Sequence, residues 1–512
     1  MQYIGSGDEM QRIDAYSIET VGIPGIVLME KAALAMEEEI VRRFPSPASV
    51  TIIAERGNNG GDGLALGRLL LARGYKVSFY EIGGVRHASE SYQTQKKILD
   101  NLGVHFLDAL PKADSDIWVD AVFGVGLKRD VAGVQREVLE EVNRRSGFKI
   151  AVDVPSGVDA SSGKILGYGF RADLTITFGL SKIGLILYPG ASLAGEVVIK
   201  DIGFPQKAVE AVRPKTIVYT REDLCRLPKR KSWSNKGSYG KVLLIVGAKN
   251  MAGAACLSAS SAYRTGSGLV RIFTCEENRE ILQSRVPEAV MTTYESEEEA
   301  LLKLPEALEW ASVVGIGPGL GQNAFTEKLL SMVLAGGHCP LVIDADGINT
   351  LAALKKEEME SAAVSDKDER QTITKLYDSY RAPMILTPHL KEMERFIGKK
   401  VADIQETLME TAEEAADAMH IFVLKDARTV VSDGSFPTYI NMSGNHGMAT
   451  GGSGDVLTGI ICGMLAGGLP ALEAARLGVY CHGLAGDKAA KEKGYYGLLA
   501  GDLVRYLNDV IR

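Results

Sequence analysis

The 512-residue chain has little of several features that mark particular classes of protein. It has six cysteines, none of them in the first 224 residues, and no two show C-x-x-C spacing. This scarcity argues against a disulfide framework and a zinc site, and it favours a reducing compartment. The longest apolar stretch, 456–469, contains four glycines and is too short to span a membrane. No basic segment followed by an apolar one begins the sequence, so we expect no signal peptide, no membrane contact and a cytoplasmic protein.

The chain also lacks an excess of positive charge. Its 57 basic and 65 acidic residues give a net charge of −8, so we expect no nucleic-acid partner. Hydrophobic residues make up 46% and charged residues 24%, which is ordinary for a globular protein and excludes a disordered chain or a coiled coil. Glycine, by contrast, is abundant, because 56 of 512 residues is about 11% against a usual level of about 7%. The surplus belongs in turns, or in loops where the backbone approaches a ligand closely.

Two halves are visible, joined near residue 230. The joining segment 226–241 is basic and is either a solvated connector or a rim that attracts phosphate. In each half, short apolar runs alternate with amphipathic segments, which predicts the β-α-β order of a doubly wound parallel sheet. The charged stretch 355–380 is weakly periodic, and we interpret it as a surface insertion without chemistry.

The first half is expected to begin with a helix from Asp8, capped by Ser6 and Glu9, and a second helix starting near Pro24. The remaining elements expected in the first half are strands at 50–54, 77–82, 117–120, 150–154 and 174–178 and helices at 64–73, 89–101 and 135–145. Those expected in the second half are strands at 242–246, 269–274, 313–316, 341–344, 384–387 and 422–425 and helices at 254–264, 324–334, 407–419, 455–463 and 471–488.

Three polar, glycine-rich clusters follow predicted strands of the first half. The segment 57–63 has four glycines in seven positions, so its backbone can approach a phosphate at a helix start, while Asn and Asp supply oxygens for a hydroxyl or a hard cation. The segments 119–127 and 152–159 place Asp120 and Asp153 at strand ends, where ligands bind in such sheets. Each cluster taken alone could be a turn with caps, but three together favour one shared site.

The strongest motif of the second half is 444–455, which leads directly into an apolar helix. Its glycines free successive N–H groups to form an anion hole for a phosphoryl group. Asp455 would stand beside that phosphate and could deprotonate an attacking hydroxyl, although an Asp at a helix start is also a common cap. The segment is no Walker loop, because no Gly-Lys-Ser/Thr follows. Further clusters lie at 236–241, 315–321 and 344–349.

The first half resembles the NAD(P)H-hydrate epimerase domain over roughly residues 1–220, through the motifs NNGGDG, VDAVFGVGL and VDVPSGVD. The resemblance implies interconversion of the R and S epimers of hydrated NADH and NADPH (NADHX and NADPHX), with Asp153 as the group that transfers a proton. It also implies a potassium ion held by Asn59, Asp120 and Ser156. The residues implied for binding the hydrate are Asn58, Asn59, Gly60, Gly61, Asp62, Gly124, Val125, Gly126, Leu127, Lys128, Arg129, Asp130 and Asp153.

The second half resembles the ribokinase-like fold, and within it the ADP- or ATP-dependent NAD(P)H-hydrate dehydratase, over about residues 225–512. Further matching segments are 386–389, 423–429 and 479–487. The resemblance implies that Asp455 is catalytic and that magnesium accompanies the nucleotide. The residues implied for contacts with the S epimer are Ala254, Gly319, His389 and Asp455. Those implied for contacts with the adenine nucleotide are Lys425, Asp426, Ala427, Arg428, Thr429 and Gly454.

The sequence therefore predicts an α/β chain with a Rossmann-like domain at 1–222 and a ribokinase-like domain at 223–512. We expect one domain to epimerise the hydrates and the other to dehydrate the S epimer at the expense of ADP or ATP, with ADP giving AMP and phosphate. Two alternatives stay open: a hydroxymethylpyrimidine-like kinase fused to a nucleotide-binding domain, and a nucleotide-binding scaffold without turnover. Because such folds commonly assemble, we expect a homo-oligomer.

Overall fold

The computed structural model describes residues 1–83, 88–362 and 372–511. The chain divides into two compact units, one formed by Tyr3–Thr216 and the other by Met1–Gln2 with Ile217–Arg512. We call them the smaller and the larger unit. This structural division lies a few residues before residues 222–223, where we expected the boundary between the domains. The boundary between the two functions stays a prediction.

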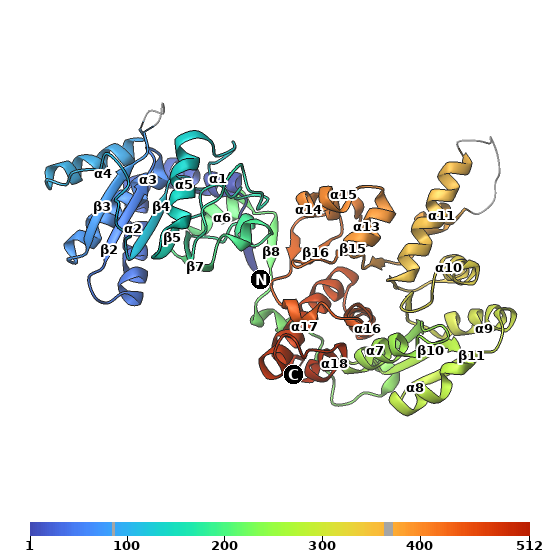
Figure 1. Ribbon diagram of the computed structural model, residues 1–512. Helices are drawn as coiled ribbons and strands as arrows, with labels where there is room; N and C mark the ends of the chain where they lie inside the picture. The colour runs from blue at the N-terminus through green and yellow to red at the C-terminus, as the bar shows by residue number, and fades with distance from the viewer. Residues whose placement is uncertain (84–87, 363–371, 512) are drawn as a thin grey trace. The chain divides into compact units, whose positions relative to one another are not determined.

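The smaller unit contains a six-stranded sheet in the order β3-β2-β4-β5-β6-β7, and all of its neighbouring strands are parallel (Figure 1). The five predicted strands are confirmed. The sequence missed β7, an edge strand whose residues are all partly or fully exposed and which therefore lacks an apolar run. The strands are β2 (Ser49–Ala54), β3 (Lys76–Glu81), β4 (Ile117–Ala121), β5 (Phe148–Val152), β6 (Leu174–Phe178) and β7 (Glu196–Lys200).

The five helices predicted for the smaller unit are present, one of them with its start displaced, and a sixth, α6 (Gln206–Val212), was not predicted. The predicted capping box is present, since Ser6 Oγ accepts from the Glu9 backbone N–H at 3.3 Å and the Ser6 N–H donates to Glu9 Oε2 at 2.8 Å. Helix α3 begins at Asn58 rather than at Leu64, so the glycine-rich segment forms its first turns. The helices are α1 (Gly7–Ala15), α2 (Gly25–Arg43), α3 (Asn58–Ala72), α4 (Glu90–Asn101), α5 (Gly133–Arg144) and α6 (Gln206–Val212), with short turns η1 (Tyr16–Thr20), η2 (Ile183–Leu185) and η3 (Gly190–Ser192).

The larger unit carries an eleven-stranded sheet in the order β1-β8-β17-β16-β15-β14-β13-β12-β9-β10-β11. The neighbouring strands from β11 to β15 in this order pair in parallel, whereas β16 pairs antiparallel with both β15 and β17. This mixed sheet confirms the predicted α/β class. The strands are β1 (Gln2–Ile4), β8 (Thr216–Val218), β9 (Lys241–Ile245), β10 (Leu269–Cys275), β11 (Val290–Tyr294), β12 (Val313–Ile316), β13 (Leu341–Ile343), β14 (Met384–Leu386), β15 (His420–Leu424), β16 (Val430–Ser432) and β17 (Thr438–Ile440).

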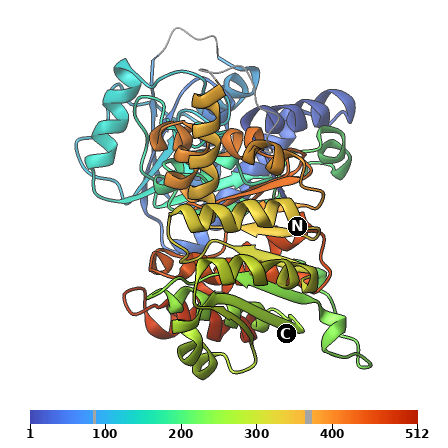
Figure 2. The ribbon, with the colours of Figure 1, turned by 90° about the vertical axis from the view of Figure 1, so that its right-hand side faces the viewer.

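Helices of the larger unit pack along this sheet: α9 (Glu297–Trp310) contacts β9 and β11, as Figure 2 shows beside the green strands, and α10 (Ala324–Gly336) packs against α9. The helix predicted at 407–419 is too long, because α15 (Leu408–Ala415) ends before residue 419, and a separate short helix, α14 (Val401–Glu406), precedes it. The predicted insertion 355–380 includes the end of α11 and all of α12, and its residues 363–371 lie outside the described residues.

The bounds of these helices are α7 (Ala252–Arg264), α8 (Arg279–Arg285), α9 (Glu297–Trp310), α10 (Ala324–Gly336), α11 (Asp346–Ala362), α12 (Ile373–Asp378), α13 (Leu390–Ile397), α14 (Val401–Glu406), α15 (Leu408–Ala415), α16 (Ser453–Ala466), α17 (Ala471–Lys493) and α18 (Ala500–Val510), with short turns η4 (Arg221–Arg226), η5 (Lys236–Tyr239), η6 (Glu276–Asn278) and η7 (His446–Met448).

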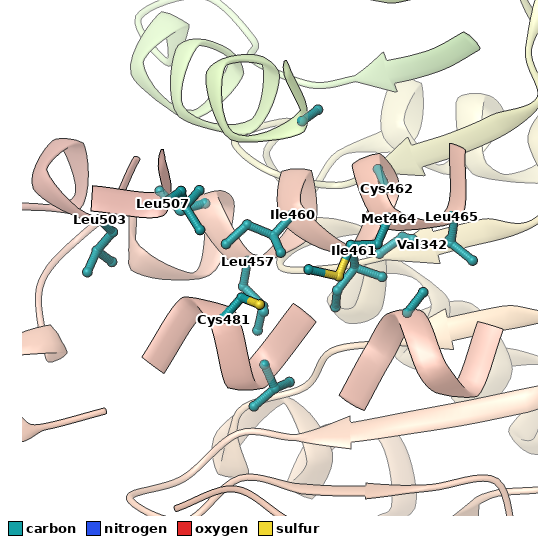
Figure 3. Packing of buried hydrophobic residues seen from close by; sticks show 14 of the residues in the cluster. Val342, Leu457, Ile460, Ile461, Cys462, Met464, Leu465, Cys481, Leu503 and Leu507 are labelled. Carbon is teal, nitrogen blue, oxygen red and sulfur yellow. The ribbon is translucent and has the colours of Figure 1, made fainter. Parts of the chain in front are cut away.

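Helix α16 is the buried centre of the larger unit. Every residue from Val456 to Leu465 is buried, so the helix is enclosed on all sides. Figure 3 shows its side chains packed with Val342 of β13, Cys481 of α17 and the two leucines of α18. This packing fixes the start of α16 and the residues at its first turn. None of the helices in the described part of the chain combines the length and apolar character needed to cross a lipid bilayer.

Candidate active sites

A cavity of about 370 Å³ opens in the smaller unit at the carboxyl ends of its strands. Parallel strands in such sheets place their ligands at this edge. Eight of the residues predicted to bind the hydrate line this cavity: Asn58, Asn59, Asp62, Gly124, Val125, Gly126, Leu127 and Asp153. The structure therefore joins the three glycine-rich segments at one cavity.

The other predicted hydrate-binding residues do not line the cavity. Gly60 and Gly61 serve the packing of α3, since a Cβ at Gly60 would lie 1.7 Å from the Glu55 carbonyl oxygen and one at Gly61 would lie 2.5 Å from the Met29 methyl group. Lys128 is exposed and pairs with Asp8 at 2.8 Å. The neighbouring Arg129 and Asp130 are also exposed.

Asp153 follows β5 and adopts a left-handed backbone with φ of 64°. Its Oδ1 accepts hydrogen bonds from Lys182 Nζ at 2.5 Å, Thr177 Oγ1 at 2.9 Å and the Phe178 N–H at 3.3 Å. Lys182 also lines the cavity, although the sequence analysis did not select it. The sequence around a lysine that follows a strand does not show whether its ammonium group is buried or lies on the surface.

Two further carboxyl groups that line the cavity interact electrostatically with Asp153. Burial raises the pKa of Asp62 well above its ordinary value, and the charges of Asp153 and Asp14 add to this effect. Burial likewise raises the pKa of Asp14, with a second contribution from Asp153. Asp62 was predicted as a ligand contact, whereas Asp14 was missed because it lies within the ordinary amphipathic pattern of α1.

Asp120 and Ser156, predicted as potassium ligands, do not line the cavity, but they are hydrogen-bonded to each other and to its lining residues Val122 and Phe123. Asp120 Oδ1 accepts from Ser156 Oγ at 2.7 Å and from the Val122 N–H at 3.2 Å, and Oδ2 accepts from the Ser156 N–H at 2.7 Å. Burial raises the pKa of Asp120 to about 6, although these hydrogen bonds act in the opposite direction. The third predicted ligand, Asn59, lies over Gly124, where an added Cβ would be 3.0 Å from Asn59 Oδ1.

In the larger unit, polar residues gather where α16 begins. Gly452 caps this helix with a φ of 90°, a conformation that favours glycine, and Asp455 stands in the first turn. Burial and the charge of Asp344 raise the pKa of Asp455 to about 6, although Lys425 acts in the opposite direction. The start of α16 is partly buried, and its free N–H groups can face an anion, so the position suits a phosphoryl group.

A buried ion pair lies against this helix start. Lys425 Nζ donates to Asp344 Oδ1 at 2.8 Å, and Thr458 Oγ1 donates to Asp344 Oδ2 at 2.7 Å. Burial acts to raise the pKa of Asp344, but the charge and hydrogen bond of Lys425 hold it below its usual range. A Cβ at Gly454 would lie 3.4 Å from Lys425 Nζ, so the predicted nucleotide residues Lys425 and Gly454 are neighbours.

The other predicted nucleotide residues, Asp426, Ala427, Arg428 and Thr429, form the turn between β15 and β16. Asp426 and Ala427 are exposed, and Thr429 Oγ1 donates to the Asp426 carbonyl oxygen at 3.4 Å. This turn therefore continues from Lys425 toward solvent.

His389 caps helix α13 next to the end of β15. Its Nδ1 accepts from the N–H groups of Lys391 at 3.1 Å and Glu392 at 3.2 Å, and its Nε2 lies 3.3 Å from Glu392 Oε1. Burial, with the charge of Lys425, lowers the pKa of His389, which favours the neutral ring. Because Nδ1 accepts two N–H groups, the proton of a neutral ring belongs on Nε2. Burial raises the pKa of Glu392 to about 7, which marks a titratable group that the sequence analysis missed.

Ala254 and Gly319 face each other near the same edge. A Cβ on Gly319, whose φ is 66°, would lie 3.0 Å from the Ala254 Cβ. Ala254 belongs to α7, and one turn later Ser258 Oγ donates to the Asp455 carbonyl oxygen at 3.0 Å. Ala254 thus lies on a helix that packs against α16, and Gly319 lies next to Ala254.

The architecture defines a class before any comparison is made. Each unit carries carboxylates and a glycine-rich helix start at the carboxyl edge of parallel strands, an arrangement typical of a two-site α/β enzyme that binds phosphate-bearing ligands. In the described part of the chain, no group of three or more His, Cys, Asp or Glu side chains is placed to hold a metal ion.

Comparisons with known proteins extend this assignment. A family model described as NAD(P)H-hydrate dehydratase matches residues 242–509, and one described as YjeF-related protein N-terminus matches residues 25–184. The bifunctional NAD(P)H-hydrate repair enzyme Nnr of Moorella thermoacetica is 37% identical over 533 residues, covering 100% of this chain and 97% of the relative. The Escherichia coli enzyme of the same name is 31% identical over 508 residues, covering 98% and 93%.

A crystal structure of the ADP/ATP-dependent NAD(P)H-hydrate dehydratase from Bacillus subtilis is similar to part of the chain, with 30% identity, coverage of 57% of this chain and 96% of that one, and a TM-score of 0.48. The chain belongs to the family of bifunctional NAD(P)H-hydrate repair enzymes. The enzyme class expected from the sequence is thereby confirmed.

Proposed function

We propose that the smaller unit interconverts the R and S epimers of NADHX and NADPHX and that the larger unit dehydrates the S epimers with ADP or ATP. The observation that carries the proposal is that both sites lie in one chain that matches repair enzymes over its whole length. ADP is the nucleotide we favour, and it would yield AMP and phosphate.

For the dehydration, we assign Asp455 as the base. It takes the proton of the C6 hydroxyl while that oxygen attacks the terminal phosphorus of the nucleotide, and the bond to the bridging oxygen breaks. The N–H groups at the start of α16 stabilise the charge on the transferring group. The lone pair of N1 then expels the phosphate, and loss of a C5 proton restores the dihydropyridine. Ala254, Gly319 and His389 would contact the hydrate, while 425–429 and Gly454 would contact the nucleotide.

For the epimerisation, we assign Asp153 as the group that transfers a proton during the C–O cleavage or ring opening that inverts C6. Asp153 Oδ1 is occupied by three donors, and no hydrogen bond joins Oδ2 to another residue in the described ranges. Oδ2 is therefore the oxygen open to a ligand in the cavity. We propose that the eight lining residues named above bind the hydrate and that 128–130 contact its outer part.

The residues around Asp120 fit a potassium ion. Its carboxylate is fully buried, its hydrogen-bond donors are all neutral, and no ion pair with it occurs among the residues described. A buried carboxylate with only neutral partners is stabilised by a cation bound through oxygen ligands. We propose that Asp120, Ser156 and Asn59 hold the ion, which supplies positive charge next to the bound hydrate.

The second site fits magnesium carried by the nucleotide. Asp344 is already paired with Lys425 and hydrogen-bonded to Thr458, so its carboxylate is engaged within the protein. Magnesium commonly keeps several waters and binds through phosphates with one or two carboxylates. We therefore propose that it neutralises charge on the phosphates and is not held by a site built from the protein alone.

We also propose a cytoplasmic location, which the six unpaired cysteines support. The homo-oligomer remains a prediction, and light scattering of the purified protein coupled to size-exclusion chromatography tests it.

The activity is tested with purified protein, S-NADPHX, ADP or ATP, and magnesium and potassium salts. We expect the absorbance of NADPH to appear together with free phosphate. A phosphorylated product without NADPH would favour the kinase alternative. Absence of turnover with either nucleotide would favour the scaffold and would contradict the proposal.

A further inference from the structure

Lys182 is a fully buried ammonium group whose bonding capacity is used entirely within the smaller unit. Its side chain is 1% exposed. Nζ donates to Asp153 Oδ1 at 2.5 Å, to Thr177 Oγ1 at 2.8 Å and to the Phe178 carbonyl oxygen at 2.9 Å. An ammonium has three N–H donors, so Lys182 has none left for a substrate.

The same contacts fix the direction of Asp153. Its Oδ1 is held by Lys182, Thr177 and Phe178, and its backbone is constrained by a hydrogen bond from the Asp153 N–H to the Ile176 carbonyl oxygen at 2.8 Å. With Oδ1 anchored in this way, the carboxylate cannot rotate freely, and Oδ2 remains for the ligand. Both Asp153 and Lys182 line the cavity.

The charges that face the cavity explain why an ammonium is needed there. Among the described residues, its titratable lining consists of four carboxyl groups, Asp14, Glu55, Asp62 and Asp153, and one ammonium, Lys182. Like charges at close range oppose ionisation, and burial opposes it further. Burial and the charge of Asp153 raise the pKa of Asp14 and Asp62, whereas in the described part of the chain Asp153 alone of these three forms an ion pair with the ammonium.

We propose that Lys182 is a positioning residue of the epimerisation, which places its positive charge against Oδ1 of Asp153 and so directs Oδ2 at the substrate. The inference rests on the proposed epimerase function. Thr177 helps to orient the Asp153 carboxylate but carries no charge: its hydroxyl accepts from Lys182 Nζ and donates to Asp153 Oδ1. The charge and the geometry can therefore be separated by mutation.

The test follows conversion of R-NADPHX to S-NADPHX by the full chain without nucleotide, over a range of pH, for wild type, Lys182→Met, Lys182→Arg and Thr177→Val. Loss of a neighbouring opposite charge lowers the acid dissociation constant of a carboxyl group by about tenfold or more. We expect Lys182→Met to be slower by about tenfold or more at neutral pH and to recover as pH rises, so that the acid limb of its rate profile moves by about one pH unit or more. Lys182→Arg and Thr177→Val keep the charge and should keep the acid limb of wild type.

Dehydration of S-NADPHX by the same preparations and their melting curves report whether each variant is folded. A Lys182→Met protein that matches wild type, or that is slowed equally at every pH while folded, overturns the inference. If Lys182→Met does not fold, an acid limb displaced by one pH unit or more in Thr177→Val overturns it, and an unmoved limb in both charge-retaining variants supports it. A wild type without any epimerisation contradicts the proposed function itself.

Discussion

Asp455 stands in the first turn of a helix, a position where aspartate is also common as a cap. Three features separate it from a simple cap. It lies beside the Lys425–Asp344 pair, burial raises its pKa to about 6, and two of the three residues before it are glycines that expose the backbone. At this scale the sequence predicted the residue and its neighbours but not the ion pair, because Asp344 and Lys425 are far apart in the chain and meet only through the sheet.

We predict that Asp455→Asn lowers the rate of S-NADPHX dehydration by about 100-fold or more, the usual contribution of a general base. The measurement is the initial rate of NADPH appearance at saturating nucleotide. Asp502→Asn is the matched control, since Asp502 also stands in the first turn of a helix and accepts the Leu499 N–H at 3.2 Å, as a cap does. Equal losses in both variants would reduce Asp455 to a structural role.

We predict that kcat/KM for dehydration falls as pH drops through about 6. The pKa of Asp455 is raised to about 6, so the residue is ionised above that pH and gains a proton below it, when it can no longer act as a base. The pKa of Glu392 is raised to about 7 and could give a similar limb. A Glu392→Gln protein should therefore retain the limb near pH 6, and its disappearance in that variant would assign the titration to Glu392 instead.

At the scale of elements, strand ends and helix starts create both sites. Alternating apolar and amphipathic segments were enough to predict the buried parallel strands, because such strands are continuous apolar runs. Elements outside that pattern were missed: β7 is a partly exposed edge strand, and α9 contains Pro305 within its length. The start of α3 was placed too late, because its glycines indicated a loop while the structure uses them for close packing against Glu55 and Met29.

One glycine shapes the second site through the backbone. Gly317 has a φ of 126°, and a Cβ there would lie 1.8 Å from the Asp344 carbonyl oxygen. We predict that Gly317→Ala destabilises the larger unit by about 1–3 kcal/mol, the usual cost of a forced backbone conformation, and lowers dehydration by displacing Asp344. Melting curves and dehydration rates measure both effects. Gly501→Ala is the control, since a Cβ at Gly501 meets no atom within 4 Å, and this variant should behave as wild type.

At the scale of the whole molecule, one chain carries two units with separate cores and separate candidate sites. Neither set of site residues includes a residue of the other unit, so the two activities should be separable by mutation. The two halves, their fold class and the residues at the strand ends could be predicted from the sequence. Lys182 and Glu392 could not, because what distinguishes them is burial beside a partner carboxylate or imidazole rather than a local pattern.

The most direct test of two sites in one chain uses an equal mixture of R- and S-NADPHX with ADP, magnesium and potassium, and follows the return of NADPH. Wild type should recover both epimers. Asp153→Asn should recover the S share quickly and then continue at the slow rate of spontaneous epimerisation, and Asp455→Asn should recover neither. A mixture of these two variant proteins should restore the complete recovery, because each supplies the site that the other lacks. Complete rapid recovery by Asp153→Asn alone, or no restoration in the mixture of two folded variants, would contradict the account.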